Sequence, residues 1–92
     1  MNVQAEVSLY PLRAATLTEP IESFLRRVRE HGLEVTTGTM SSRVAGECKH
    51  LFAALGEAFE DAAGGGDVVL VVKVSNACPP AGERERDAGE ST

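Results

Sequence analysis

The stretch Val68-Val69-Leu70-Val71-Val72-Lys73-Val74-Ser75 is the part of this 92-residue sequence that decides its fold. Alternate residues of a strand point to opposite faces, so the first half of this strand is apolar on both faces. One face would hold Val68, Leu70, Val72 and Val74, and the other Val69, Val71, Lys73 and Ser75. Helices on one side of a sheet cover a single face, so we expect another subunit to cover the second face.

The segments before this strand show a strand pattern and then a helix pattern. Residues 3–10 alternate apolar and polar side chains, as in a half-buried strand, and Pro11 ends the pattern. Thr16-Leu17-Thr18-Glu19-Pro20 supplies an N-cap candidate and a first-turn proline for a helix, and Gly32 suits its C-terminal end. The predicted apolar stripe of this helix consists of Ile21, Phe24, Leu25 and Val28. Off the stripe, Arg26, Arg27 and Arg29 predict a solvated face.

A hairpin and a second helix are predicted for the middle of the chain. Residues 33–39 and 42–46 are the two expected strands, with a turn near Met40-Ser41. Residues 47–63 predict a helix that Gly64-Gly65-Gly66 ends. Its predicted buried stripe consists of Leu51, Phe52, Leu55, Ala58, Phe59 and Ala62.

The resulting order, βαββαβ, predicts an α+β fold of the ferredoxin-like type, with a four-stranded antiparallel sheet and both helices on one face. We expect the first and last strands to be central, antiparallel neighbours, with Glu6 near Lys73. Residues 1–79 would form one domain, and residues 80–92 a disordered polar tail.

Composition and charge exclude several classes of function. A formal net charge of −5 and scattered basic residues argue against nucleic acid and against an anionic membrane as partners. The chain has no apolar run of the roughly 20 residues that a membrane span needs and no secretory signal pattern, so we expect a cytoplasmic protein. Cys48 and Cys78 fit no zinc spacing, and His31 and His50 add no cluster, so we predict neither a metal nor a cofactor.

Three segments of the chain resemble a known family. Val7-Ser8-Leu9-Tyr10-Pro11-Leu12, Gly38-Thr39-Met40-Ser41-Ser42 and Val74-Ser75-Asn76-Ala77-Cys78-Pro79 resemble the YkoF-like family of thiamine- and hydroxymethylpyrimidine-binding proteins. The resemblance implies a non-enzymatic binder of thiamine or its hydroxymethylpyrimidine part, in transport, salvage or sequestration. Members of that family commonly carry two such domains in tandem, whereas this chain has one. A homodimer or homotetramer formed through the sheet would then supply the neighbouring domain.

The same three segments supply the candidate ligand-binding residues, which are Ser8, Tyr10, Gly38, Met40, Ser41, Ser42, Asn76 and Cys78. An asparagine offers a donor and an acceptor, which match an aminopyrimidine edge, and the serines add hydroxyl groups. Tyr10 or Met40 would form a wall for the ring, and a tyrosine face also attracts a thiazolium cation. Four of these residues also have a structural interpretation: Asn76 as a turn residue, Tyr10 as a cover for the sheet edge, Met40 as a core filler, and Gly38 as a turn position with positive φ.

Catalysis and ligand-free assembly are the alternatives to ligand binding. An enzyme with Cys78 as nucleophile would need His31 or His50 within about 3 Å, and no pattern in the sequence predicts that approach, so we expect no enzymatic activity. The alternative to ligand binding is a ligand-free oligomerisation module of the same fold, in which the doubly apolar last strand serves only assembly.

Overall fold

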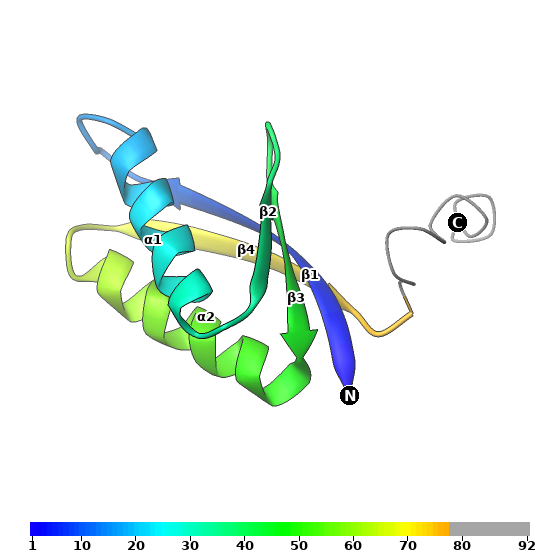
Figure 1. Cartoon of the computed structure of the whole chain (residues 1–92). Helices are drawn as coiled ribbons and strands as arrows, with labels where there is room; N and C mark the ends of the chain where they lie inside the picture. Colours follow the sequence, from blue (N-terminus) through cyan, green and yellow to red (C-terminus); the bar gives the residue numbers. More distant parts are fainter. Residues whose placement is uncertain (78–92) are drawn as a thin grey trace.

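The computed structural model describes residues 1–77 and has the predicted order βαββαβ (Figure 1). Its elements are β1 (Asn2–Pro11), α1 (Thr18–Glu30), β2 (Glu34–Thr37), β3 (Ser42–Glu47), α2 (Cys48–Ala63) and β4 (Val68–Ser75). The predicted strand boundaries agree within one residue, except that β2 ends before Gly38 rather than at Thr39. Cys78 and the predicted tail, residues 80–92, lie outside the described residues.

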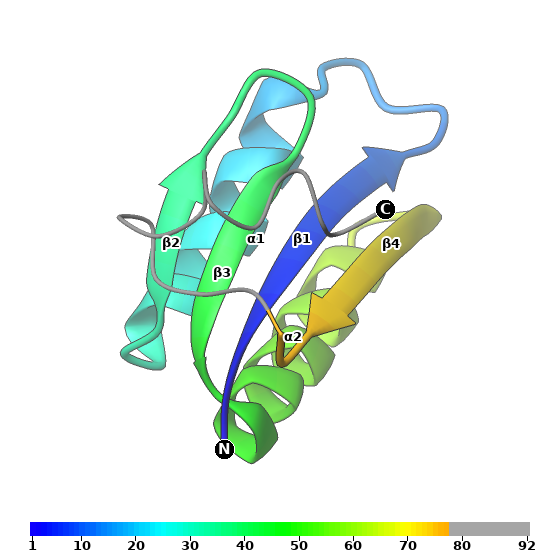
Figure 2. The same cartoon turned by 90° about the vertical axis from the view of Figure 1, so that its right-hand side faces the viewer.

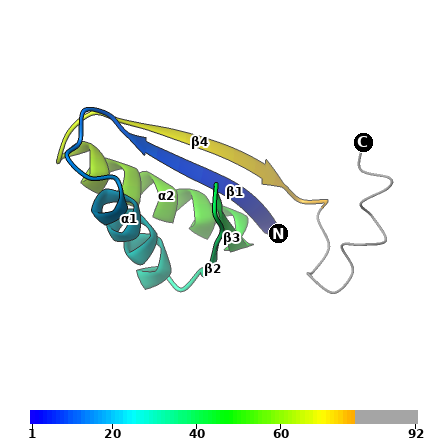
Figure 3. The ribbon, with the colours of Figure 1, turned by 90° about the horizontal axis from the view of Figure 1, so that it is seen from above.

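The four strands form one antiparallel sheet in the order β2-β3-β1-β4 (Figure 2). Both helices cover the same face of this sheet, and the other face is open in the described chain (Figure 3). This arrangement confirms the α+β ferredoxin-like fold. The pairing of β1 with β4, with Glu6 opposite Lys73, also agrees with the prediction.

The expectation that the last strand is central is wrong. The two central strands are β1 and β3, and β4 lies at an edge beside β1. The chain leaves β3, crosses over the sheet through α2 and returns on the far side of β1, so β4 gains one strand neighbour only.

The hydrophobic core fills the space between the sheet and the two helices. Its buried residues are Val3, Ala5, Val7, Leu9, Phe24, Leu25, Val28, Leu33, Val44, Leu51, Ala54, Leu55 and Ala58. The period of two in β1 and the stripe of α1 are therefore confirmed. On α2, however, Phe52 and Phe59 are 51% and 36% exposed, and Ala54 is buried. Each of these phenylalanines follows a core-facing position by about 100° around the helix, which puts both on the flank of the buried face.

The alternation in β4 agrees with the prediction along most of the strand. Val68, Leu70 and Val72 pack against the core, while Val69 and Val71 are both 45% exposed on the open face. Val74 was expected on the buried face but is 38% exposed. It is the last apolar residue of an edge strand, where a single neighbouring strand flanks it.

The helix ends agree in part with the sequence prediction. The N-cap of α1 is Leu17, and no side chain bonds to the free N–H groups there, although Pro20 does lie in the first turn. At the other end Gly32 has φ of 84°, as expected for a residue that ends a helix. In α2 the side chain of Glu47 caps the helix, accepting a hydrogen bond from His50 N at 3.0 Å. That bond lowers the pKa of Glu47.

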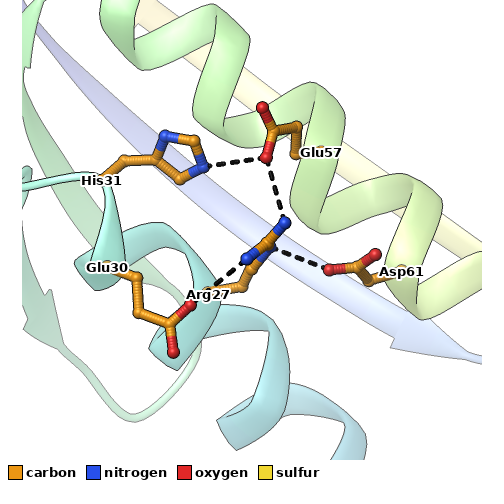
Figure 4. A network of polar contacts seen from close by, with 5 residues as sticks. All are labelled: Arg27, Glu30, His31, Glu57 and Asp61. Atoms are coloured by element: carbon orange, nitrogen blue, oxygen red, sulfur yellow. Dashed lines mark hydrogen bonds and ion pairs between the residues drawn. The ribbon is translucent and has the colours of Figure 1, made fainter.

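A polar network ties the two helices together on their outer side (Figure 4). The guanidinium of Arg27 contacts Glu57 at 3.1 Å, Asp61 at 2.9 Å and Glu30 at 3.3 Å. His31 Nε2 also lies 3.2 Å from Glu57 Oε1. The hydrogen bond to Glu30 and the negative charge of Asp61 raise the pKa of Arg27. Arg27 keeps 41% of its side chain exposed, as predicted for a solvated face, and it also bridges α1 and α2.

Across residues 1–77, no helix combines the length and the apolar character needed to cross a membrane.

Candidate ligand pocket

The open end of β1 is the structural basis of the candidate site. β3 pairs with β1 from Asn2 to Val7, whereas β4 continues along β1 to Pro11. Within the described chain, residues 8–11 therefore have no strand on the side of β3 (Figure 2). The N–H and C=O groups of successive residues in a strand point alternately toward its two neighbouring strands. Some of these groups in residues 8–11 therefore point toward the side of β3, where no strand pairs with them.

The β2–β3 loop forms the opposite border of this opening. Gly38 N donates a hydrogen bond to Ser41 O at 2.9 Å, which closes the loop into a tight turn. A Cβ on Gly38 would lie 2.5 Å from that same carbonyl oxygen. Gly38 does not have positive φ, so the interpretation based on a left-handed turn is wrong. Glycine is required here because the two backbone segments approach closely.

A pocket of about 280 Å³ lies between the end of β1, the β2–β3 loop and the first turns of α1. The core side chains of Val7 and Leu9 and the α1 side chains of Ile21, Phe24 and Leu25 supply apolar walls. Hydroxyl-bearing residues of β1 and of the loop supply polar groups. No Asp, Glu, Lys, Arg or His is among the lining residues that the structure describes. Apolar walls with a few convergent polar groups are typical of a small-molecule site.

Six of the eight predicted site residues line this one pocket: Ser8, Tyr10, Gly38, Met40, Ser41 and Ser42. They come from two segments that are separated in sequence and meet at the end of β1. Tyr10 and Met40 are 51% and 88% exposed, which puts them at the mouth, whereas Ser42 is buried.

Asn76 does not join this group. Asn76 follows the end of β4, where Ser75 pairs with Gln4, and Gln4 is about 14 Å from Ser8 along β1 at about 3.4 Å per residue. Because β1 and β4 are antiparallel, β4 ends beside the start of β1, whereas Ser8 is near the end of β1. Asn76 and Ser8 are therefore at opposite ends of β1. The turn after β4 is held by Ser75 Oγ, which accepts a hydrogen bond from Ala77 N at 2.9 Å. Cys78 lies outside the described residues.

Several pocket residues were missed in the sequence. Thr37 and Thr39 flank Gly38, so extending the recognised loop segment in both directions would have found them. The apolar stripe of α1 is predicted as part of the core, and three of its four residues also line the pocket. Glu6 touches the site indirectly, because its Oε2 accepts a hydrogen bond from Ser41 Oγ at 3.0 Å. The pairing of Glu6 with Arg43 on β3 brings it near Ser41, and a sequence pattern alone does not show this pairing.

A larger hollow of about 650 Å³ lies between α1, α2 and the loops that precede α1 and β4. Its lining contains charged side chains of both signs that pair with one another, such as Arg13 with Asp67 and Arg27 with Asp61. A ligand there would compete with these ion pairs, so the smaller pocket at the end of β1 is the stronger candidate.

The fold and the pocket together define a small ferredoxin-like α+β domain with a neutral, hydroxyl-lined site at the end of its first strand. The sequence matches the YKOF-related family over residues 2–81. The chain therefore belongs to that family, which confirms the resemblance found in its three segments.

Several solved structures have the same fold. A hypothetical protein from Methanocaldococcus jannascii is 24% identical and superposes with a TM-score of 0.78 over 97% of this chain and 94% of that one. A protein from Thermotoga maritima, described as a "putative thiamine biosynthesis/salvage protein", is 16% identical with a TM-score of 0.77 over 100% of both chains. A Streptococcus pneumoniae protein is 17% identical with a TM-score of 0.79 over 95% of this chain and 99% of that one. At these identities the likeness shows the fold. None of the curated proteins matches the chain.

Proposed function

We propose that this protein binds thiamine or its hydroxymethylpyrimidine part and catalyses no reaction, acting in transport, salvage or sequestration in the cytoplasm. The observation that carries the proposal is the convergence of six predicted residues from two separate segments on one neutral pocket. Membership of the YKOF-related family supports it, as does the thiamine-related name of the Thermotoga maritima protein.

The chemistry of the pocket matches an aminopyrimidine ring. The flat ring would pack against the apolar side chains that line the site. Its donor and acceptor edge would bond to the hydroxyls of Ser8 and Ser41 and to the unpaired peptide groups of residues 8–11. An amino group left without a partner would cost about 1–3 kcal/mol, so this polar edge determines which rings bind. Tyr10 at the mouth would face the thiazolium cation, an attraction of about 0.5–2 kcal/mol.

We further propose that two or four copies associate through the open face of the sheet. On that face the half-exposed Val69 and Val71 lie opposite Tyr10 and Ser8 of β1, which makes an apolar surface beside the pocket. In a single subunit Asn76 is at the far end of β1, so its predicted contact with ligand requires a neighbouring copy.

Calorimetric titration of the protein with thiamine and with hydroxymethylpyrimidine tests the binding. We expect both to bind, because recognition rests on the pyrimidine edge that they share. Ser8→Ala should weaken binding by about tenfold, the effect of losing one hydrogen bond of about 1.4 kcal/mol. Ser23→Ala, an exposed position on α1 outside this pocket, is the matched control and should bind like the parent.

The ligand-free oligomerisation module is the second candidate, and the half-exposed valines of β4 favour it. Binding of neither compound by a protein that still forms a dimer or tetramer in sedimentation would overturn the first proposal and support this one.

A further inference from the structure

Glu6 lies on the open face of the sheet and reaches the pocket wall through a single side-chain contact. Its Oε2 accepts the hydrogen bond of Ser41 Oγ at 3.0 Å. Ser41 itself lines the pocket, from the position just before β3. Glu6 is thus a carboxylate bonded directly to a pocket hydroxyl, although it is not itself a lining residue. Arg29 is a second charged group bonded to a hydroxyl of this pocket, donating from Nη2 to Thr37 Oγ1 at 3.3 Å, and it leaves the proton of that hydroxyl free.

This contact decides what Ser41 offers to a ligand. A serine hydroxyl has one proton to donate and two lone pairs that accept. A carboxylate is a stronger acceptor than a neutral group, so the proton of Ser41 is held toward Glu6. The lone pairs of Oγ remain for the pocket, and the hydroxyl loses its ability to adapt to either a donor or an acceptor.

We propose that Glu6 is a positioning residue that makes Ser41 a dedicated hydrogen-bond acceptor, and that the pocket thereby selects ligands which present an N–H group at this wall. An exocyclic amino group on a pyrimidine ring is such a group, and a ring acceptor or carbonyl oxygen in its place is disfavoured. The inference deepens the proposed function and rests on it.

A purely structural role for Glu6 is the rival explanation. Glu6 is opposite Arg43 on β3 and Lys73 on β4, so its negative charge lies in a row between two cations. Cross-strand attraction in this row depends on the charge of the carboxylate. Acceptance of the Ser41 proton needs an acceptor oxygen at that position, which an amide supplies more weakly than a carboxylate. Glutamine keeps the oxygen and removes the charge, and alanine removes both.

The test compares Glu6→Gln, Glu6→Ala and Ser41→Ala by calorimetric titration with hydroxymethylpyrimidine and with the same pyrimidine lacking its amino group. We expect Glu6→Ala and Ser41→Ala to weaken binding of the amino compound by about tenfold. Binding of the compound without the amino group should change by less than about twofold. Glu6→Gln keeps an acceptor oxygen and should weaken binding of the amino compound clearly less than Glu6→Ala does. Glu6 and its two cross-strand partners are exposed, so thermal melting of the variants is expected to stay close to that of the parent.

The possible results separate this inference from the proposed function. Equal weakening in Glu6→Gln and Glu6→Ala would overturn the positioning role in favour of the charge row. Binding of both compounds with the same affinity in the parent and all three variants would overturn it as well, while the proposed function would stand. Failure of the parent to bind hydroxymethylpyrimidine or thiamine would overturn both.

Discussion

Replacing Gly38 by alanine tests the close backbone approach that shapes one border of the pocket. The added Cβ would lie 2.5 Å from Ser41 O, and this oxygen belongs to the backbone, so it cannot rotate away as a side chain would. The loop has to open instead. Opening strains or breaks the 2.9 Å hydrogen bond from Gly38 N to the same oxygen.

The expected cost is the sum of two contributions. Losing a backbone hydrogen bond costs about 0.5–1.5 kcal/mol, and forcing extra atoms into a filled site costs about 1–3 kcal/mol. At the lower end of both ranges the free energy of unfolding falls by about 1.5 kcal/mol. A change of 1 kcal/mol shifts the melting temperature of a domain this size by about 4–8 °C, so we expect a fall of about 6–12 °C.

Thermal unfolding followed by circular dichroism measures this shift, and Gly56→Ala is its matched control. Gly56 lies in α2, and a Cβ there meets no atom within 4 Å. Alanine is favoured over glycine inside a helix by about 0.5–1 kcal/mol, so this substitution should raise the melting temperature. The reasoning fails if Gly38→Ala melts at or above the parent temperature, or if both substitutions shift it in the same direction.

Two further predictions concern the core and the cap of α2. Leu51 is 0% exposed, so Leu51→Ala should lower the free energy of unfolding by about 2–5 kcal/mol in urea titration, and the neighbouring Phe52→Ala, at a half-exposed position, should cost clearly less. Equal losses would contradict the observed orientation of α2. The pKa of Glu47 is lowered from 4.5, so its carboxylate stabilises the fold above that value and this contribution is lost as pH falls through the lower pKa of the folded state. Glu47→Gln should therefore be less stable than the parent near about pH 7, with the difference closing toward about pH 3, whereas the exposed Glu60→Gln should show no such closing.

Periodicity was sufficient to predict most of the fold, because burial of one face imposes a period on every element. The alternation in β1 and the stripe of α1 follow directly from this. Periodicity does not encode the order of strands in the sheet, which depends on where each crossover lands, so the edge position of β4 was missed. It also overestimates the width of a buried helix face when large apolar residues lie on the flank, as Phe52 and Phe59 do.

Six of the eight predicted binding residues line one pocket, for a reason that topology makes clear. Residues of β1 and of the β2–β3 loop meet because the loop starts beside the point where β1 loses its β3 neighbour. Asn76 also ends a strand, and strand ends look alike in a sequence. The ends of β1 and β4 nevertheless point in opposite directions, since the two strands are antiparallel neighbours. Glu6 has no motif of its own and becomes visible only through its register and its bond to Ser41.

The proposed ligand binding and the proposed assembly would share one residue, Tyr10. Tyr10 lines the mouth of the pocket, and it is paired with Val69 at the apolar end of the open sheet face. A second copy seated on that face would limit the positions open to the half-exposed Tyr10 ring, and a ligand under the ring would do the same from the other side. Two events that order the same side chain favour each other, because the entropy lost in ordering it is lost once. The proposed binding and the proposed oligomer are therefore expected to be coupled through Tyr10, with equal effects in both directions.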